Sequence, residues 1–156
     1  MKKLLTTIFI LSLLTITAQA DDKQEALNFF NNYVKQANSY SDSITKMYTP
    51  NAKIIRQVVK PDGTTADAVT DTTTYIKQMR ISQSIAKMRH YTNAYSNVTV
   101  TALGNGSYKI SSLRTPMQDK DKLKTYMIIK KQPNGQWLIT EEMMQTKQQI
   151  FLRYAK

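Results

Sequence analysis

Three charged residues alternate with apolar ones in segments that have the composition of β-strands: Arg56, Arg114 and Glu141. Because successive strand side chains point to opposite faces, each charge should share a face with the apolar residues two positions away. A charge on such a face must be paired or face water, since unpaired burial is costly. We therefore predict a polar cluster at a pocket mouth, where the arginines could bind an anionic or polar ligand. The alternatives are purely structural pairing, or a β-bulge that shifts the alternation.

Tyrosine is frequent, with nine copies in 156 residues. Several stand at amphipathic positions, where their hydroxyl groups would lie at the boundary of the core or line a pocket. The ligand-binding candidates taken from this group are Tyr33, Tyr95 and Tyr126. Packing at the core boundary is the alternative role for the same residues.

No set of residues with the spacing of a catalytic or metal site stands out. His90 is the only histidine and follows a predicted helix, where an imidazolium would complement the helix dipole or act as a base. The chain has no cysteine, no second histidine for zinc and no acidic loop with calcium spacing. We therefore assign no catalytic residue, no metal site and no cofactor.

The first residues have the pattern of a secretory signal peptide. Two lysines precede an apolar run over residues 4–16, and Ala18-Gln19-Ala20 follows as a cleavage site. We expect cleavage after Ala20, which divides the chain into a signal peptide, 1–20, and one mature domain, 21–156. An uncleaved anchor is the alternative, although the apolar run is shorter than the roughly 18 residues typical of a membrane span. Export predicts a periplasmic protein.

Basic residues outnumber acidic ones by 22 to 11. Without Lys2 and Lys3 the count is 20 to 11, so the expected mature domain carries a net charge of about +9. Such a charge favours an acidic protein, an anionic envelope polymer or lipid head groups as partners. Because the chain is expected to be exported, we predict no nucleic acid partner and no stable membrane insertion.

Periodicity predicts helices, then a hairpin, then another helix and a four-stranded meander. The predicted helices span 22–38, 41–48 and about 72–87, the last with an inner stripe of Tyr75, Ile76, Met79, Ser82 and Ile85. The predicted strands span 52–60, 64–70, 91–103, 108–117, 123–132 and 136–145. This order indicates an α+β fold, a cone-shaped roll of a curved antiparallel sheet packed on about three helices in the N-terminal half.

Two segments resemble the nuclear transport factor 2-like superfamily, also known as the cystatin-like α+β roll. One is Ile44-Thr45-Lys46-Met47-Tyr48-Thr49-Pro50-Asn51-Ala52-Lys53-Ile54, the entry into the sheet. The other is Asn134-Gly135-Gln136-Trp137-Leu138-Ile139, a turn before a tryptophan-led strand. The resemblance implies a fold that hosts isomerases, dehydratases, carriers and interaction proteins, so it does not decide activity. Enzymes of this superfamily place a carboxylate or histidine base in the cone, and no residue here matches such a motif.

The sequence favours an exported, non-catalytic binding or protein-interaction module, with a small ligand in the cone or an acidic envelope partner. A homodimer through the open sheet face is a further expectation. Two alternatives stay open: a small isomerase, dehydratase or hydrolase with His90 or Glu141 as its base, and an envelope lipid carrier. A cone filled by Phe29, Phe30 and Trp137 would exclude the carrier.

Overall fold

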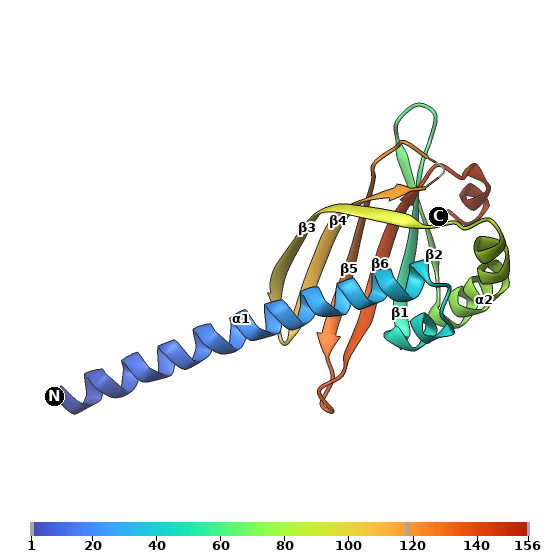
Figure 1. The fold of residues 1–156 in the computed structure, drawn as a ribbon. Coiled ribbons are helices and arrows are strands. Elements are labelled where there is room, and N and C mark those ends of the chain that lie inside the picture. Colours follow the sequence, from blue (N-terminus) through green and yellow to red (C-terminus); the bar gives the residue numbers. More distant parts are fainter. Residues whose placement is uncertain (1, 118, 156) are drawn as a thin grey trace.

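Ten helices and strands make up the chain in a computed structural model that describes residues 2–117 and 119–155, with side chains from residue 19 on (Figure 1). In order they are α1 Lys2–Asn38, η1 Asp42–Met47, β1 Tyr48–Val59, β2 Thr65–Thr70, α2 Thr72–Met88, β3 Asn93–Gly104, β4 Ser107–Pro116, β5 Leu123–Lys131, β6 Trp137–Thr146 and η2 Gln149–Tyr154. The predicted order of helices and strands is confirmed, as is the α+β class. The second predicted helix is a 3₁₀ helix, which suits its length of one to two turns.

The strands form one six-stranded sheet in the order β2-β1-β6-β5-β4-β3. The hairpin β1–β2 and the meander β3–β6 are antiparallel, as predicted. The prediction of a wholly antiparallel sheet is wrong at one place, because β1 and β6 run parallel. These two strands join the hairpin to the meander, and no local turn links them, so short-range signals carry no information about their direction.

Helix α1 crosses the concave side of the sheet (Figure 1). From this helix Ala26, Phe30 and Tyr33 are buried among apolar residues of the strands. The opposing core residues include Ile54, Ile110, Ile129, Ile139 and Trp137. The cone is therefore filled at its centre by side chains of α1 and the sheet.

Helix α2 follows the hairpin and packs against β1 through its first half. Its start is fixed by Asp71, whose carboxylate accepts a hydrogen bond from the Thr74 amide at 2.9 Å. The predicted inner stripe is correct at Tyr75 and Met79, which pack against the core. It is wrong at Ser82 and Ile85, which are exposed, because the second half of the helix extends past the part of the sheet that it covers.

Helix α1 begins at Lys2, so it includes the segment predicted to be a signal peptide. Among the side chains described, Asp22 and Glu25 both pair with Lys131, at 3.0 and 2.8 Å. Glu25 also accepts a hydrogen bond from the Trp137 indole at 2.9 Å. These contacts hold the helix against the β5–β6 hairpin from residue 22 onward. Within the described chain, none of the helices combines the length and apolarity of a bilayer span.

Candidate functional site

The inner and outer faces of β6 are set by a β-bulge. Ile129 of β5 pairs with Ile139, but Ile128 pairs with Glu141, so Thr140 is an extra residue in β6. The alternation therefore shifts by one position after Ile139. As a result Glu142 points into the cone and Glu141 points away from it, which corrects the prediction that Glu141 shares a face with Ile139.

Glu142 is fully buried and is the acceptor of four side-chain hydrogen bonds. Its four donors come from three elements, α1, β1 and α2: Tyr48 at 2.5 Å, Tyr33 at 3.0 Å, Arg56 at 3.1 Å and Tyr75 at 3.3 Å. We call this group the Glu142 cluster. It joins α1, α2, β1 and β6 at one point, and Arg56 balances the carboxylate charge.

The tyrosines of the Glu142 cluster are neutral donors. Burial raises the pKa of Tyr33 and of Tyr48 well above its usual value, and the negative charge of Glu142 raises both further. Burial also raises the pKa of Tyr75, again with a contribution from Glu142. Their protons therefore stay in place to bind the carboxylate across the physiological pH range.

Arg114 is buried to a similar degree but lacks a carboxylate partner. Only 7% of its surface is exposed. Its guanidinium donates to the side chain of Asn93 at 2.8 Å, to the carbonyl of Gln145 at 2.8 Å and to the hydroxyl of Tyr91 at 3.4 Å. Its Nε–H has no acceptor, and no carboxylate within the described residues forms an ion pair with it. A buried cation in contact with neutral groups alone leaves its charge uncompensated.

Arg114 lies in the wall of an open hollow of about 510 Å³ at the mouth of the cone. The walls come from the second half of α2, the start of β3, the ends of β4 and β6, and η2. Its lining residues are Arg56, Arg89 and Arg114, with Ser82, Ile85, Ala86, Tyr91, Asn93, Met144, Gln145, Thr146, Gln148 and Phe151. We call this cavity the arginine hollow. All its charged lining residues are arginines, so it combines positive charge with an apolar wall.

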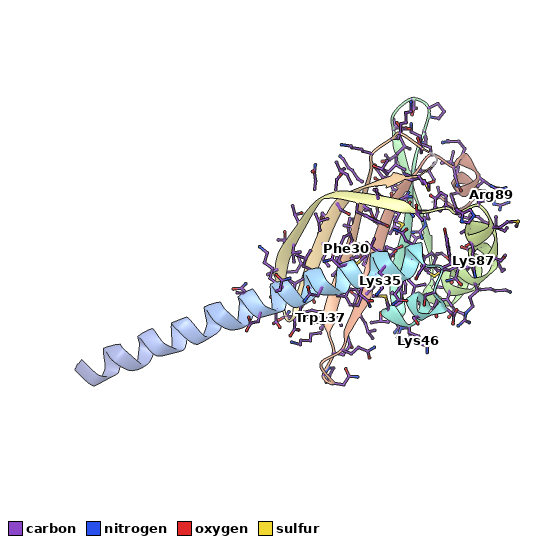
Figure 2. The ribbon with its side chains drawn as sticks, viewed as in Figure 1. Phe30, Lys35, Lys46, Lys87, Arg89 and Trp137 are labelled. Atoms are coloured by element: carbon purple, nitrogen blue, oxygen red, sulfur yellow. The ribbon has the colours of Figure 1, made fainter. Side chains whose placement is uncertain are left out.

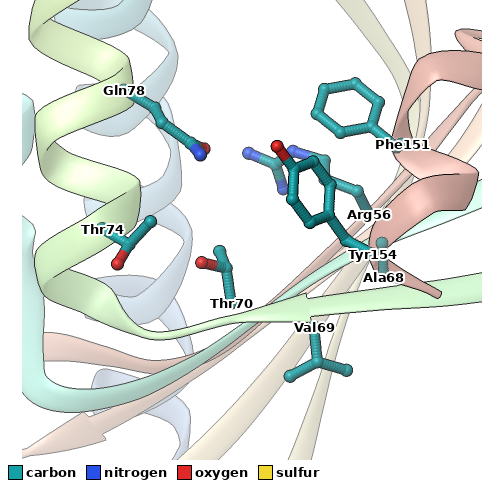
Figure 3. A pocket seen from close by; sticks show the side chains of 8 residues that line it. All are labelled: Arg56, Ala68, Val69, Thr70, Thr74, Gln78, Phe151 and Tyr154. Atoms are coloured by element: carbon teal, nitrogen blue, oxygen red, sulfur yellow. The ribbon is translucent and has the colours of Figure 1, made fainter. Parts of the chain in front are cut away.

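A second, smaller cavity of about 110 Å³ lies on the other side of Arg56. Figure 3 shows the Arg56 guanidinium close to Gln78 of α2, with the rings of Phe151 and Tyr154 beside it. Val69 lines the same cavity, but its side chain points away from the others (Figure 3). Arg56 and Phe151 line both cavities, so these two residues form the partition between them.

The six candidate ligand residues lie in four different places. Arg56 and Arg114 line the arginine hollow. Tyr33 belongs to the Glu142 cluster, and Tyr95 packs edge-on against Phe30 in the core. Neither of these tyrosines lines either cavity, so the predicted placement in the pocket is wrong for both. It is also wrong for Glu141 and Tyr126, which lie on the opposite sheet face, where the Tyr126 hydroxyl donates to Glu141 at 2.5 Å.

Sequence reasoning missed Glu142, Arg89 and the apolar part of the hollow. The adjacent pair Glu141-Glu142 must place one carboxylate on each face of a strand, but simple alternation selects the wrong one. Only the bulge at Thr140 decides between them, and it has no glycine or proline to mark it. His90 is exposed, with a φ of 51°, and lines neither cavity. Neither His90 nor Glu141 lines the two cavities, so neither is placed to act as a base in them.

Several solved structures have a fold similar to that of this chain. A protein of unknown function from Pectobacterium atrosepticum superposes with a TM-score of 0.61 at 16% identity, over 81% of this chain and 91% of that one. A domain with a cystatin-like fold from Nostoc punctiforme superposes with a TM-score of 0.55 at 11% identity, over 84% of this chain and 83% of that one. A nuclear transport factor 2-like protein from Shewanella oneidensis superposes with a TM-score of 0.54 at 10% identity, over 82% of this chain and 99% of that one.

This chain has the nuclear transport factor 2-like fold. The same fold occurs in chains proposed to be a ketosteroid isomerase and a scytalone dehydratase. No family model matches the sequence, and no curated protein matches it. At these identities the likeness concerns the fold, so the activity of this chain must be argued from its own site.

Proposed function

We propose that this protein is an exported, non-catalytic binding protein that holds a small organic anion in the arginine hollow. The observation that carries the proposal is Arg114, a buried cation without a carboxylate partner in the wall of an open cavity. A carboxylate, sulfate or phosphate group in the hollow would compensate this charge through charge-assisted hydrogen bonds. Arg89 would supply a second cation from the rim.

The apolar wall of the hollow indicates the rest of the ligand. Met144 and Phe151 line one side, and Ile85 and Ala86 of α2 line another. A ligand with a short apolar part beside its acidic group would bury apolar surface against these residues. The hollow is open at the cone mouth, and the cone behind it is filled by Phe30 and Trp137, with Phe29 packed against them. This packing counts against enclosure of a whole acyl chain inside the cone, as an envelope lipid carrier would need.

The absence of a base in the hollow supports binding rather than catalysis. Glu142 pairs with Arg56, a lining residue of the hollow, but it lines neither cavity and accepts hydrogen bonds from four donors. A general base must reach the proton that it removes. Export is supported by the leader pattern of residues 1–20, and a role for the open sheet face in forming a homodimer remains a separate proposal.

The binding proposal is tested by native mass spectrometry and calorimetry with octanoate as the probe. We expect octanoate to bind the wild-type chain. We expect its affinity for Arg114→Gln and for Arg89→Gln to be lower by a factor of about ten or more, because each variant loses a charged hydrogen-bond donor. Arg89 is exposed, so its variant should fold normally even if Arg114→Gln is destabilised. The matched control is Lys53→Gln, which removes one positive charge from an exposed position on the opposite sheet face. Equal affinity in all four proteins would reject the hollow as the site.

A further inference from the structure

The outward surface of α2 has features that the arginine hollow does not explain. Three large apolar residues are exposed there: Ile81 at 63%, Ile85 at 48% and Met88 at 73%. Their spacing of four and then three residues places them on one side of the helix. Tyr75 and Met79, which pack against the core, lie on the other side. Ile81, Ile85 and Met88, which we call the apolar stripe, therefore lie on the side of α2 that is turned away from the core.

The charges of α2 all have one sign. Lys77, Arg80 and Lys87 lie on the helix and Arg89 follows it, whereas residues 72–91 contain no acidic residue. Arg80 forms an exposed ion pair with Asp42, which leaves the other three without a carboxylate partner among the described residues. Figure 2 shows Lys87 and Arg89 close together at the end of α2. The apolar stripe is thus bordered by cations.

We infer that α2 docks on the surface of a bilayer that contains anionic phospholipid. An interfacial helix presents an apolar side flanked by Lys and Arg, so that the apolar residues enter the head-group boundary and the cations meet lipid phosphates. Ile81, Ile85 and Met88 with Lys77 and Lys87 have this arrangement. A second copy of the chain fits this surface poorly, because two such faces would bring their cations together.

This inference rests on different side chains from those that carry the proposed function, but the two surfaces adjoin. Ile85 belongs to the exposed stripe and also lines the arginine hollow. A docked α2 would therefore place the mouth of the hollow at the lipid surface. An amphipathic anion could then pass between the bilayer and the hollow with little exposure of its apolar part to water.

The test is sedimentation of the purified chain with vesicles of phosphatidylcholine alone or mixed equally with phosphatidylglycerol. We expect binding to the mixed vesicles only, and binding about tenfold weaker for the double variants Ile81→Ser/Met88→Ser and Lys77→Gln/Lys87→Gln. The matched control is Val69→Ser/Leu103→Ser, which removes two apolar residues that are each 50% exposed elsewhere. All these positions are exposed, so unchanged thermal unfolding would show that the variants fold.

Three results would overturn the inference. The first is no binding to either vesicle, and the second is equal loss in the control variant. The third is a stripe-dependent change in oligomeric state or capture of an acidic protein without vesicle binding, which would assign the surface to a protein partner. Octanoate binding by the stripe variants separates this test from the proposed function, because it should be unchanged when docking alone is lost.

Discussion

At the scale of single residues, the neighbours Glu141 and Glu142 have opposite roles. Glu142→Gln would leave Arg56 buried without its carboxylate partner, so we expect the free energy of unfolding to fall by about 3–5 kcal/mol. Glu141→Gln, on the outer face, should cost less than about 1 kcal/mol, because its partner Tyr126 is partly solvated. Urea unfolding followed by the fluorescence of Trp137 measures both. Equal losses in the two variants would contradict the assignment of the faces.

The residue scale is also where prediction from the sequence had least success. Alternation correctly placed Arg56 and Arg114 on the inner face, because β1 and β4 keep their register around these residues. It misplaced Glu141 because one extra residue, Thr140, reverses every position that follows. Glu142 compensates the charge of Arg56, whereas Arg114 has no carboxylate partner among the described residues. This difference depends on contacts between distant strands, so the local sequence pattern could not predict it.

At the scale of elements, Glu25 holds α1 against the β5–β6 hairpin. Hydrogen bonds from Lys131 and then from Trp137 lower the pKa of Glu25 below its ordinary value of 4.5. A lowered pKa in the folded state means that this contact stabilises the fold above about pH 4.5 and that the stability is lost as pH falls through the folded-state pKa. We expect Glu25→Gln to reduce the loss of stability between neutral and acidic pH. Thermal unfolding of the wild-type chain and of Glu25→Gln across this pH range measures the difference in stability. Identical pH profiles of the two proteins would count against a stabilising role for the contact.

The cap of α2 gives a second prediction for an element. Hydrogen bonds from Thr74 hold the pKa of Asp71 below its usual range. We expect Asp71→Asn to keep the helix start and Asp71→Ala to be less stable than both the wild type and Asp71→Asn, since alanine offers no acceptor to the first turn. Chemical denaturation compares them, and equal stability of wild type and Asp71→Ala would show that the cap contributes nothing.

Most elements could be predicted because their signals are local. Pro61-Asp62-Gly63 and Asn134-Gly135 mark turns, and Gly135 indeed has a φ of 82°. The parallel pairing of β1 with β6 could not be predicted, because their first residues, Tyr48 and Trp137, are 89 positions apart in the sequence. The hairpin, α2 and three strands lie between them. The exposed half of α2 was also missed, since an apolar stripe does not reveal whether it faces a core or a partner.

At the scale of the whole molecule, the leader pattern predicts where the chain is cut. We expect the protein recovered from the cell envelope to begin at Asp21, because Ala18 and Ala20 provide the small residues that signal cleavage needs. Asp22 and Glu25 would remain in the mature chain, so their contacts with Lys131 should survive cleavage. N-terminal sequencing and intact mass measure this, and recovery of the chain with Met1 and the leader intact would contradict it.

The central claim concerns the whole molecule as a binding protein: a buried, uncompensated arginine makes the mouth of the cone a site for an organic anion. Calorimetric titration with octanoate and with octanol tests it most directly, because the two probes have equal chain lengths and only one is charged. We predict that octanoate binds at least about tenfold more tightly than octanol, and that Arg114→Gln reduces this preference about tenfold. Equal affinity of the wild-type chain for the two probes, or a preference for octanoate that is unchanged in Arg114→Gln, would contradict the claim.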